Sequence, residues 1–329
     1  MSDVIDIVWF KRDLGVFDNI ILSKSSRTNK ILPLYIFEPD LWQQPDVSYR
    51  QYLFLKESLR DFDKNLKEIG ASLVIKVGDA VEVLNKLSQD NNVRRLWSHQ
   101  ETWNMWSYQR DLKVKLWAKS KGIEWIEPSR NGVVRGLNDR DGWARSWQIK
   151  MRERPQQPPQ RLDAIWLNSD LIPDARRLKL DISQSKSTQL ASRMQAMSCL
   201  NSFLDHRGSN YSYEMSSPIT AERACSRISA YLAFGQISIR EVFQAVGRRK
   251  DDLSSRDKAF SKSLRSFSSR LSWHCHFIQK LEDQPSIETN TLHSSFENLR
   301  PSFYDHKNLK AWETGMTGYP MIDACMRYL

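Results

Sequence analysis

The sequence has 329 residues, of which 40% are hydrophobic, and a formal net charge of +10 at pH 7. A chain of this length can bury a substantial core and is long enough for two domains. It contains no run of 18 apolar residues, which excludes a membrane-spanning helix, and two acids precede its first apolar run, which is the wrong order for a secretory signal. We therefore expect a soluble intracellular monomer, cytoplasmic or located in a plastid.

The charge balance and the aromatic content suggest classes of ligand. Lys and Arg number 49 against 39 Asp and Glu, which favours a polyanionic partner, and counterion release makes nucleic acid the first candidate. Twelve tryptophans are typical of stacking sites and flavin proteins, although core packing accounts for most tryptophans. The four cysteines form no CxxC pair, so we expect buried free thiols rather than zinc or disulfides.

Strand-like and helix-like segments alternate through the first 130 residues. Five short apolar runs have the length of strands: 4–10, 31–37, 72–77, 93–98 and 123–126. Helical patterns lie between them, which predicts a mostly parallel sheet covered on both faces, a doubly wound α/β domain. The sequence after the first run, KRDLG, is not GxGxxG, and no GxxxxGK[ST] occurs. The sequence therefore disfavours an ordinary dinucleotide dehydrogenase and a P-loop NTPase.

Three helices are predicted between these strands. The clearest has its apolar residues on one face, at Leu55, Leu59, Phe62, Leu66 and Ile69. Gly70 follows where a helix C-cap glycine belongs. The other two helices are marked by Val81, Val83, Leu84 and Leu87, and by Leu112 and Leu116.

The alternation ends at Arg130. A polar stretch with three prolines and a charged run over 168–192 predict a long connection between domains. From about Met194 onward the segments are helical in pattern. We therefore expect an α/β domain over 1–130, a connector over 131–193 and an all-α domain over 194–329.

The first chemistry-bearing segment of the second half is 211–239. Within it, the stretch from Cys225 to Ser229 opens an apolar periodic run. Small polar residues at a helix start leave backbone N–H groups free for an anion, so a diphosphate fits there. Simple N-capping of the helix by Ser226 is the alternative.

The second segment is 264–282. The His-Cys-His triplet at 274–276 carries imidazoles two residues apart, which point in different directions on a helix, so we expect no metal site. Phe267, Arg270, Trp273 and His274 are spaced to bring aromatic and cationic groups towards one face. That face suits a planar ligand, a base or a phosphate, and core packing beside an exposed arginine is the alternative.

The third segment is 312–329. Thr317 to Pro320 predicts a turn, with the proline in the first turn of a helix. Asp323 and Arg327 then lie four residues apart and can pair. The chain reaches Leu329 inside an apolar periodic run without Gly, Asn or Pro, so we expect the helical domain to be truncated.

Taken together, these segments resemble the photolyase/cryptochrome family of blue-light flavoproteins over essentially the whole chain. VWFKRDLGVFDN resembles the family's opening strand and turn, with Gly15 where arginine is usual. The Cys225–Ser229 stretch with YLAFGQIS, and TGYPMIDACMR from Thr317 to Arg327, resemble motifs of its helical domain. Segments such as WHCHFIQKLED look closest to the plant-type photolyase-like branch and its bacterial relatives.

The resemblance implies an antenna-type α/β domain followed by an incomplete all-α FAD-binding domain. The positions that match FAD-binding residues are Tyr213, Cys225, Ser226, Arg227, Ile228, Ser229, Phe267 and His274. Cys225 replaces the usual threonine. Trp273 matches the tryptophan that stacks on a flipped pyrimidine dimer, and Arg270 stands where repair enzymes have a proton-donating glutamate. These two are the predicted catalytic residues, although arginine cannot relay a proton at neutral pH.

The implied activity is that of a DNA photolyase, a lyase in which light-excited, reduced FAD passes an electron to a pyrimidine dimer in damaged DNA and splits it. Arg270 and His274 favour the alternative, a cryptochrome-like photoreceptor without repair, and truncation gives a third, an inactive fragment. An antenna pigment of folate or deazaflavin type, or an empty relic of its site, is expected at the strand ends and around 41–50. The expected DNA contacts, unless they form only a solvated face, are Arg248, Arg249, Lys250, Lys262 and Arg265.

Overall fold

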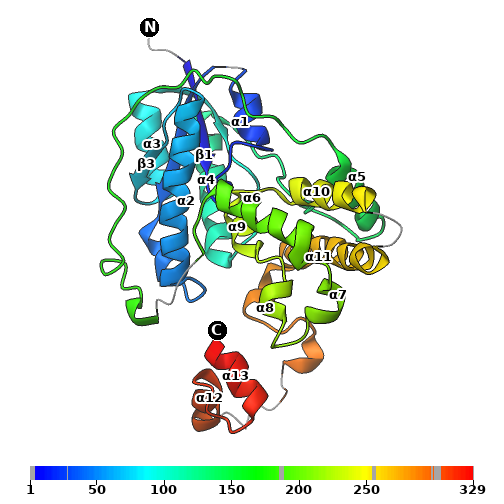
Figure 1. The fold of residues 1–329 in the computed structure, drawn as a ribbon. Helices are drawn as coiled ribbons and strands as arrows, with labels where there is room; N and C mark the ends of the chain where they lie inside the picture. The colour runs from blue at the N-terminus through cyan, green and yellow to red at the C-terminus, as the bar shows by residue number, and fades with distance from the viewer. Residues whose placement is uncertain are drawn as a thin grey trace. The chain divides into compact units, whose positions relative to one another are not determined.

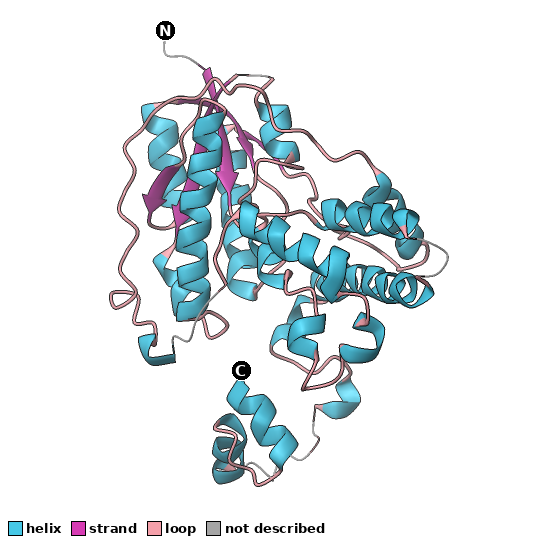
Figure 2. Ribbon diagram, in the orientation of Figure 1, coloured by secondary structure: helices cyan, strands magenta, loops and turns pink. Residues whose placement is uncertain are grey.

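The structure is a computed structural model that describes residues 4–27, 29–184, 189–253, 257–297, 299 and 305–328. The chain divides into two compact units, Met1–Pro285 and Ser286–Leu329. In the first unit a sheet with its covering helices precedes a helical part (Figures 1 and 2).

The N-terminal part is built on a five-stranded sheet of order β3-β2-β1-β4-β5, in which all neighbours are parallel. Its strands are β1 (Val4–Phe10), β2 (Lys30–Phe37), β3 (Val74–Val77), β4 (Asn92–Trp97) and β5 (Glu124–Ile126). All five predicted strands are confirmed. The strand order reverses between β1 and β4, so the loops that follow these two strands diverge and leave a crevice at the carboxyl edge of the sheet.

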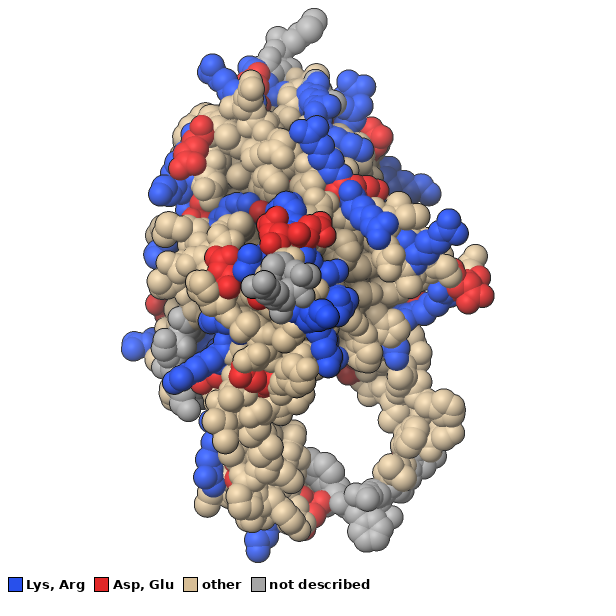
Figure 3. Space-filling model, turned by 45° about the vertical axis from the view of Figure 1, so that its right-hand side comes forward, with Lys and Arg blue, Asp and Glu red and all other residues tan. Residues whose placement is uncertain are grey.

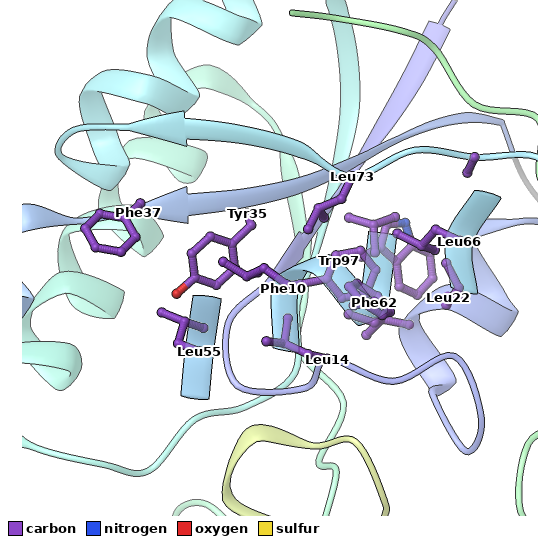
Figure 4. Packing of buried hydrophobic residues seen from close by; sticks show 14 of the residues in the cluster. Phe10, Leu14, Leu22, Tyr35, Phe37, Leu55, Phe62, Leu66, Leu73 and Trp97 are labelled. Atoms are coloured by element: carbon purple, nitrogen blue, oxygen red, sulfur yellow. The ribbon is translucent and has the colours of Figure 1, made fainter. Parts of the chain in front are cut away.

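Helices cover both faces of this sheet, as predicted. Alternate side chains of β1 point to opposite faces, so Val8 and Phe10 join one core while Ile7 and Trp9 join the other. The first core lies against α1 (Ile20–Ser25) and α2 (Tyr49–Glu68), and the second against α3 (Ala80–Asp90) and α4 (Met105–Lys121). In the first core Phe10 meets Phe62 of α2 edge to face, with ring centroids 4.7 Å apart (Figure 4).

The three predicted helices of this domain are present, but the two leucines that mark one of them do not form its buried face. Gly70, just past the end of α2, has φ +86, a conformation that a C-cap glycine allows. On α4, Leu112 and Leu116 are 39% and 70% exposed, whereas Val114 and Trp117 are buried. The large tryptophan determines which side of α4 faces the sheet, because it buries more apolar area than a leucine.

The helical part of the first unit begins earlier than its sequence pattern indicates. Its elements are α5 (Trp143–Arg152), α6 (Arg193–Ser202), the π-helical turn η3 (Phe203–Arg207), α7 (Tyr211–Glu214), α8 (Ala221–Ala224), α9 (Ser229–Phe234), α10 (Ile239–Asp252) and α11 (Lys258–Asp283). The expected connector, 131–193, is mostly irregular but contains α5. Trp143, Trp147 and Met151 of α5 are buried in the core of the helical part.

The loop after β1 packs directly on the end of α9. The N–H of Leu14 donates to the carbonyl of Phe234 at 2.9 Å. A Cβ on Gly15 would lie 2.6 Å from the carbonyl oxygen of Gly235, which leaves no room for a side chain. In this packing, position 15 therefore accepts only glycine.

The described part of the second unit contains the α-helices α12 (His306–Glu313) and α13 (Pro320–Tyr328), preceded by the short 3-10 turns η4 (Pro285–Glu288) and η5 (Ser294–Phe296). The predicted turn before α13 is confirmed. The carboxylate of Asp323 accepts from the Thr317 N–H and hydroxyl and from the Gly318 N–H, and Arg327 lies 3.9 Å from it. Leu329 lies outside the described residues. Within the described ranges, no helix is both long and apolar enough to cross a membrane.

Candidate functional site

The loop between α8 and α9 does not have the simple capped form. The N-cap residue of α9 is Ile228, and no side chain caps that helix, so the alternative in which Ser226 caps it is wrong. Arg227 has φ +60, which turns the chain just before α9. Ile228 is buried, Cys225 and Ser226 are half-buried, and Arg227 and Ser229 are exposed.

One side of this loop is held by Arg207, the last residue of η3. Its guanidinium donates to the carbonyls of Arg223, Cys225 and Ser226 at 3.0, 2.6 and 3.3 Å, and to that of Cys199 at 3.0 Å. In a planar trans peptide the N–H points away from the C=O. The Ser226 N–H follows the Cys225 carbonyl and the Arg227 N–H follows the Ser226 carbonyl. Both N–H groups are therefore directed away from Arg207.

The arrangement suits an anion on the far side of the loop from Arg207. Backbone N–H groups and the small hydroxyl side chains of Ser226 and Ser229 are the donors found around phosphate groups. The Cys225 thiol contributes less, because it is a weak donor. Burial raises its pKa, which Arg227 and Arg207 partly oppose. No sequence motif points to Arg207, because the groups that it contacts are main-chain carbonyls, which every residue has.

The face of α11 divides into a buried and an exposed part. Phe267 is buried in the core, with its ring centroid 4.6 Å from Phe203 and 5.7 Å from Tyr211. Trp273 is 49% exposed, and the Arg270 guanidinium lies over its ring at 5.3 Å. Burial raises the pKa of the Tyr211 hydroxyl, and the positive charge of Arg270 partly opposes this shift. The predicted catalytic pair is thus brought together as a cation on an exposed aromatic ring.

Two predicted residues lie elsewhere. Tyr213 is 65% exposed, and Lys262 lies over its ring at 4.9 Å. His274 lines a cavity that faces the α/β domain, together with Arg12 and Arg130, and burial and these cations lower its pKa. The structure therefore separates His274 from the Arg270–Trp273 pair.

The second histidine of the triplet faces another direction. The Nδ1 of His276 lies 3.2 Å from an Arg140 nitrogen, and its ring packs on Trp143. Among the described residues, no three His, Cys, Asp or Glu side chains are grouped to hold a metal ion.

The basic residues expected to contact DNA are not equivalent. Arg249 donates to the carbonyl of Leu204 at 2.9 Å, a structural role, whereas Arg265 donates to the Ser261 hydroxyl of its own helix at 3.2 Å. In Figure 3 Lys and Arg side chains are dispersed among fewer acidic ones rather than gathered in one stripe.

A cavity of about 80 Å³ lies at the carboxyl ends of β1 and β2, beside η1 (Pro39–Gln43). Three polar atoms of residues that line it are buried and have no hydrogen-bond partner among the described residues: Glu38 Oε1, Trp42 Nε1 and Gln51 Oε1. Native structures leave few such atoms unsatisfied. The cavity thus has the chemistry of a small polar binding site, in the region where the sequence predicts an antenna pigment.

Protonation of Glu38, in the lining of this cavity, makes the stability of the protein depend on pH. Burial raises its pKa to about 7 from 4.5, against the opposing effect of Arg110, which bonds to its Oε2 at 2.9 Å. The folded chain therefore holds a proton that the unfolded chain releases between about pH 4.5 and pH 7. The stability that this group contributes is present at the acidic end of that window and is lost as the pH rises through it.

Glu38→Gln, which stays neutral, should remove this dependence. We expect wild type to lose stability relative to the variant as the pH rises from about 5 to 7, by at most about 1.4 kcal/mol per pH unit. Urea unfolding of both chains at several pH values measures the difference. A difference that stays constant with pH would show that Glu38 is ionised throughout.

Comparisons with known proteins agree with this architecture. Residues 6–136 match the family model for DNA photolyase, and residues 267–329 match the model for the FAD-binding domain of DNA photolyase. Together the two models match more than half of the chain, in the order expected.

Relatives include both photolyases and cryptochromes. A deoxyribodipyrimidine photo-lyase of Agrobacterium fabrum is 26% identical over 98% of this chain and 68% of its own length. Cryptochrome-2 of Arabidopsis thaliana is 26% identical over 98% of this chain and 56% of its own length. The chain spans 56% to 70% of the length of the curated photolyases and cryptochromes that it matches.

A solved structure shows the same fold. The crystal structure of a bacterial class III photolyase from Agrobacterium tumefaciens superimposes with a TM-score of 0.80 at 24% identity, over 99% of this chain and 68% of the other. From the two family models, the relatives and this fold, the chain belongs to the photolyase/cryptochrome family.

Proposed function

We propose that this protein binds FAD between the Cys225–Ser229 loop and the exposed face of α11, and that it uses blue light to repair pyrimidine dimers in DNA. The observation that carries the proposal is the Arg207-held loop, which directs its N–H groups away from the arginine and so provides a place for a diphosphate. We keep an α/β domain at 1–130, a connector at 131–193 and a helical domain at 194–329 as our proposed division of the chain, with α5 of the connector packed into the core of the helical domain.

FAD, when bound, supplies the light absorption and the transferable electron, and the residues of the chain hold and orient the reactants. Ser226 and Ser229 donate to its phosphates, with Tyr213, Arg227 and Ile228 around them. Phe267 is too deeply packed to do more than support this side from the core.

Trp273 and Arg270 are the residues that meet the lesion. An exposed indole offers a stacking surface for an extruded base. Arg270 can stabilise negative charge on the dimer or bind a flanking phosphate, but it cannot pass on a proton. Arg248, Lys250, Lys262 and Arg265 are proposed to bind the DNA backbone.

Trp273→Ala should weaken binding to an oligonucleotide with a single pyrimidine dimer by about tenfold or more, because base–aromatic stacking contributes about 1–3 kcal/mol per base. Trp166→Ala, which removes another exposed tryptophan (69% exposed), serves as the matched control and should leave this affinity unchanged. Fluorescence anisotropy measures both. Equal affinities for the wild type and the Trp273 variant would remove the tryptophan from the lesion site.

A cryptochrome-like photoreceptor is the second candidate, and the guanidinium of Arg270 over Trp273, where a carboxylic acid is usual, favours it. Illumination of the protein with dimer-containing DNA separates the two functions. Light-dependent loss of dimers supports repair. Photoreduction of the flavin with all dimers intact supports the photoreceptor.

We also propose that the cavity beside Glu38 and Trp42 binds part of an antenna pigment of folate or deazaflavin type. The unpartnered Glu38, Trp42 and Gln51 atoms support a ligand with both donors and acceptors. The cavity has a volume of about 80 Å³, so side chains must move before a whole pigment can enter it. Extraction of a second chromophore from protein of the native source tests this.

A further inference from the structure

A second cavity, of about 190 Å³, lies in the crevice between the loops that follow β1 and β4. Lys11, Arg12 and Asp13 line it from the first loop, and residues 99–102 from the second. Leu232 of α9 and His274 and Ile278 of α11 close it from the helical part. Open parallel sheets bind ligands at this point, where the strand order reverses.

His99 is the clearest sign of a ligand in this cavity. The residue is 3% exposed, and its Nδ1 lies 2.6 Å from the Asp13 Oδ2. The carboxylate holds the hydrogen on Nδ1, so the neutral imidazole presents a lone pair on Nε2. Nε2 is buried and has no hydrogen-bond partner in the described part of the chain. A buried acceptor of this kind needs a donor.

Arg130 supplies the opposite chemistry. One of its guanidinium nitrogens donates to the Arg12 carbonyl, and no carboxylate among the described residues lies within ion-pair distance of it. Burial lowers its pKa, but a guanidinium remains charged at neutral pH. The cavity therefore contains a half-buried cation that has no carboxylate within ion-pair distance among the described residues.

The acids that line the cavity are already engaged. Asp13 accepts from His99 and from the Lys11 N–H at 2.7 Å. Glu101 accepts from Arg12 at 2.8 Å and from Arg110 at 2.6 Å. Lys11 pairs with Asp111 at 3.2 Å, so Arg130 is the cation of the lining that no carboxylate among the described residues neutralises directly.

We propose that this crevice binds a hydrogen phosphate group. Such a group has acceptor oxygens for Arg130 and Arg12, and its P–OH can donate to His99 Nε2, so one ligand satisfies both unmet requirements. The volume of about 190 Å³ suits a tetrahedral oxyanion and is below the range of about 300–1,000 Å³ in which drug-sized ligands bind. The site is separate from the proposed flavin loop and does not depend on it.

Equilibrium dialysis of the full chain against labelled inorganic phosphate tests the proposal, with sulfate and AMP as competitors. We expect saturable binding of one phosphate, with sulfate about tenfold weaker, because it has no hydrogen to donate to Nε2 at neutral pH. Strong competition by AMP assigns the site to a nucleotide phosphate, and weak competition assigns it to free phosphate.

Variants locate the binding. His99→Asn keeps a donor for Asp13 but removes Nε2, and Arg130→Gln removes the cation, so each should weaken phosphate binding at least tenfold. Arg145→Gln, an exposed arginine of α5, is the control and should bind as wild type does. Thermal unfolding confirms that each variant is folded, and FAD uptake should stay unchanged in all of them. Absence of saturable binding to wild type, or equal binding by wild type and a folded His99→Asn variant, overturns the proposal.

Discussion

Gly235→Ala should lower the free energy of unfolding by about 3 kcal/mol or more. Gly235 has φ +77, which side-chain-bearing residues rarely adopt. A Cβ there would lie 2.6 Å from the Asp13 Cα and 2.7 Å from the Arg12 carbonyl oxygen. Both are backbone atoms of the loop after β1, so neither can move without opening the junction between the α/β and helical parts.

Urea unfolding of the full chain measures this loss, and Gly247→Ala provides a matched control. Gly247 lies within α10, and a Cβ there meets nothing within 4 Å. Alanine at 247 should therefore stabilise the protein by about 0.5–1 kcal/mol, because glycine weakens helix interiors. A Gly235→Ala protein as stable as wild type would show that the junction is looser than described.

Arg207→Ala should weaken FAD binding about tenfold or more, which is the second large effect that we expect. The variant leaves the carbonyls of Cys225 and Ser226 without their charged donor, and hydrogen bonds to charged groups contribute about 1.5–3 kcal/mol each. The loop is then free to turn its peptides, so the orientation of its N–H groups is no longer fixed. The effect is indirect, so Arg207 is a positioning residue.

Quenching of FAD fluorescence on binding measures this change. Arg207→Lys keeps the charge but not the forked donor geometry, so it should fall between the wild type and the alanine variant. Arg223→Ala removes a nearby exposed side chain while leaving its carbonyl in place, and should bind FAD as wild type does. If the Arg207→Ala protein bound FAD with wild-type affinity, the arginine would not contribute to flavin binding.

The sheet and α2 were predictable because their signals are local. Buried parallel strands have short, continuous apolar runs, and α2 has a regular apolar face that ends at Gly70. The buried face of α4 was not predictable in this way, because Leu116 and Trp117 compete for it and only the sheet decides. Helix α5 was missed since it lies in a charged, proline-flanked segment, and its Trp147 becomes buried only against the helical part.

The candidate site was likewise predictable from the sequence only in part. The family resemblance located the Cys225–Ser229 loop, but the arginine that holds it is identified only in the structure, since its contacts are to main-chain carbonyls. Helical spacing placed His274 near Trp273, but spacing gives only an angle around the axis. It does not show that His274 faces the sheet crevice.

The most direct test of the account is the chromophore of the protein purified from its native source. We predict a yellow protein whose released cofactor is FAD, in about one equivalent per chain, and we expect the Arg207→Ala variant to retain less FAD than the wild type. A colourless protein that takes up no flavin even when FAD is supplied in excess would contradict the proposed flavin site and, with it, the light-driven chemistry.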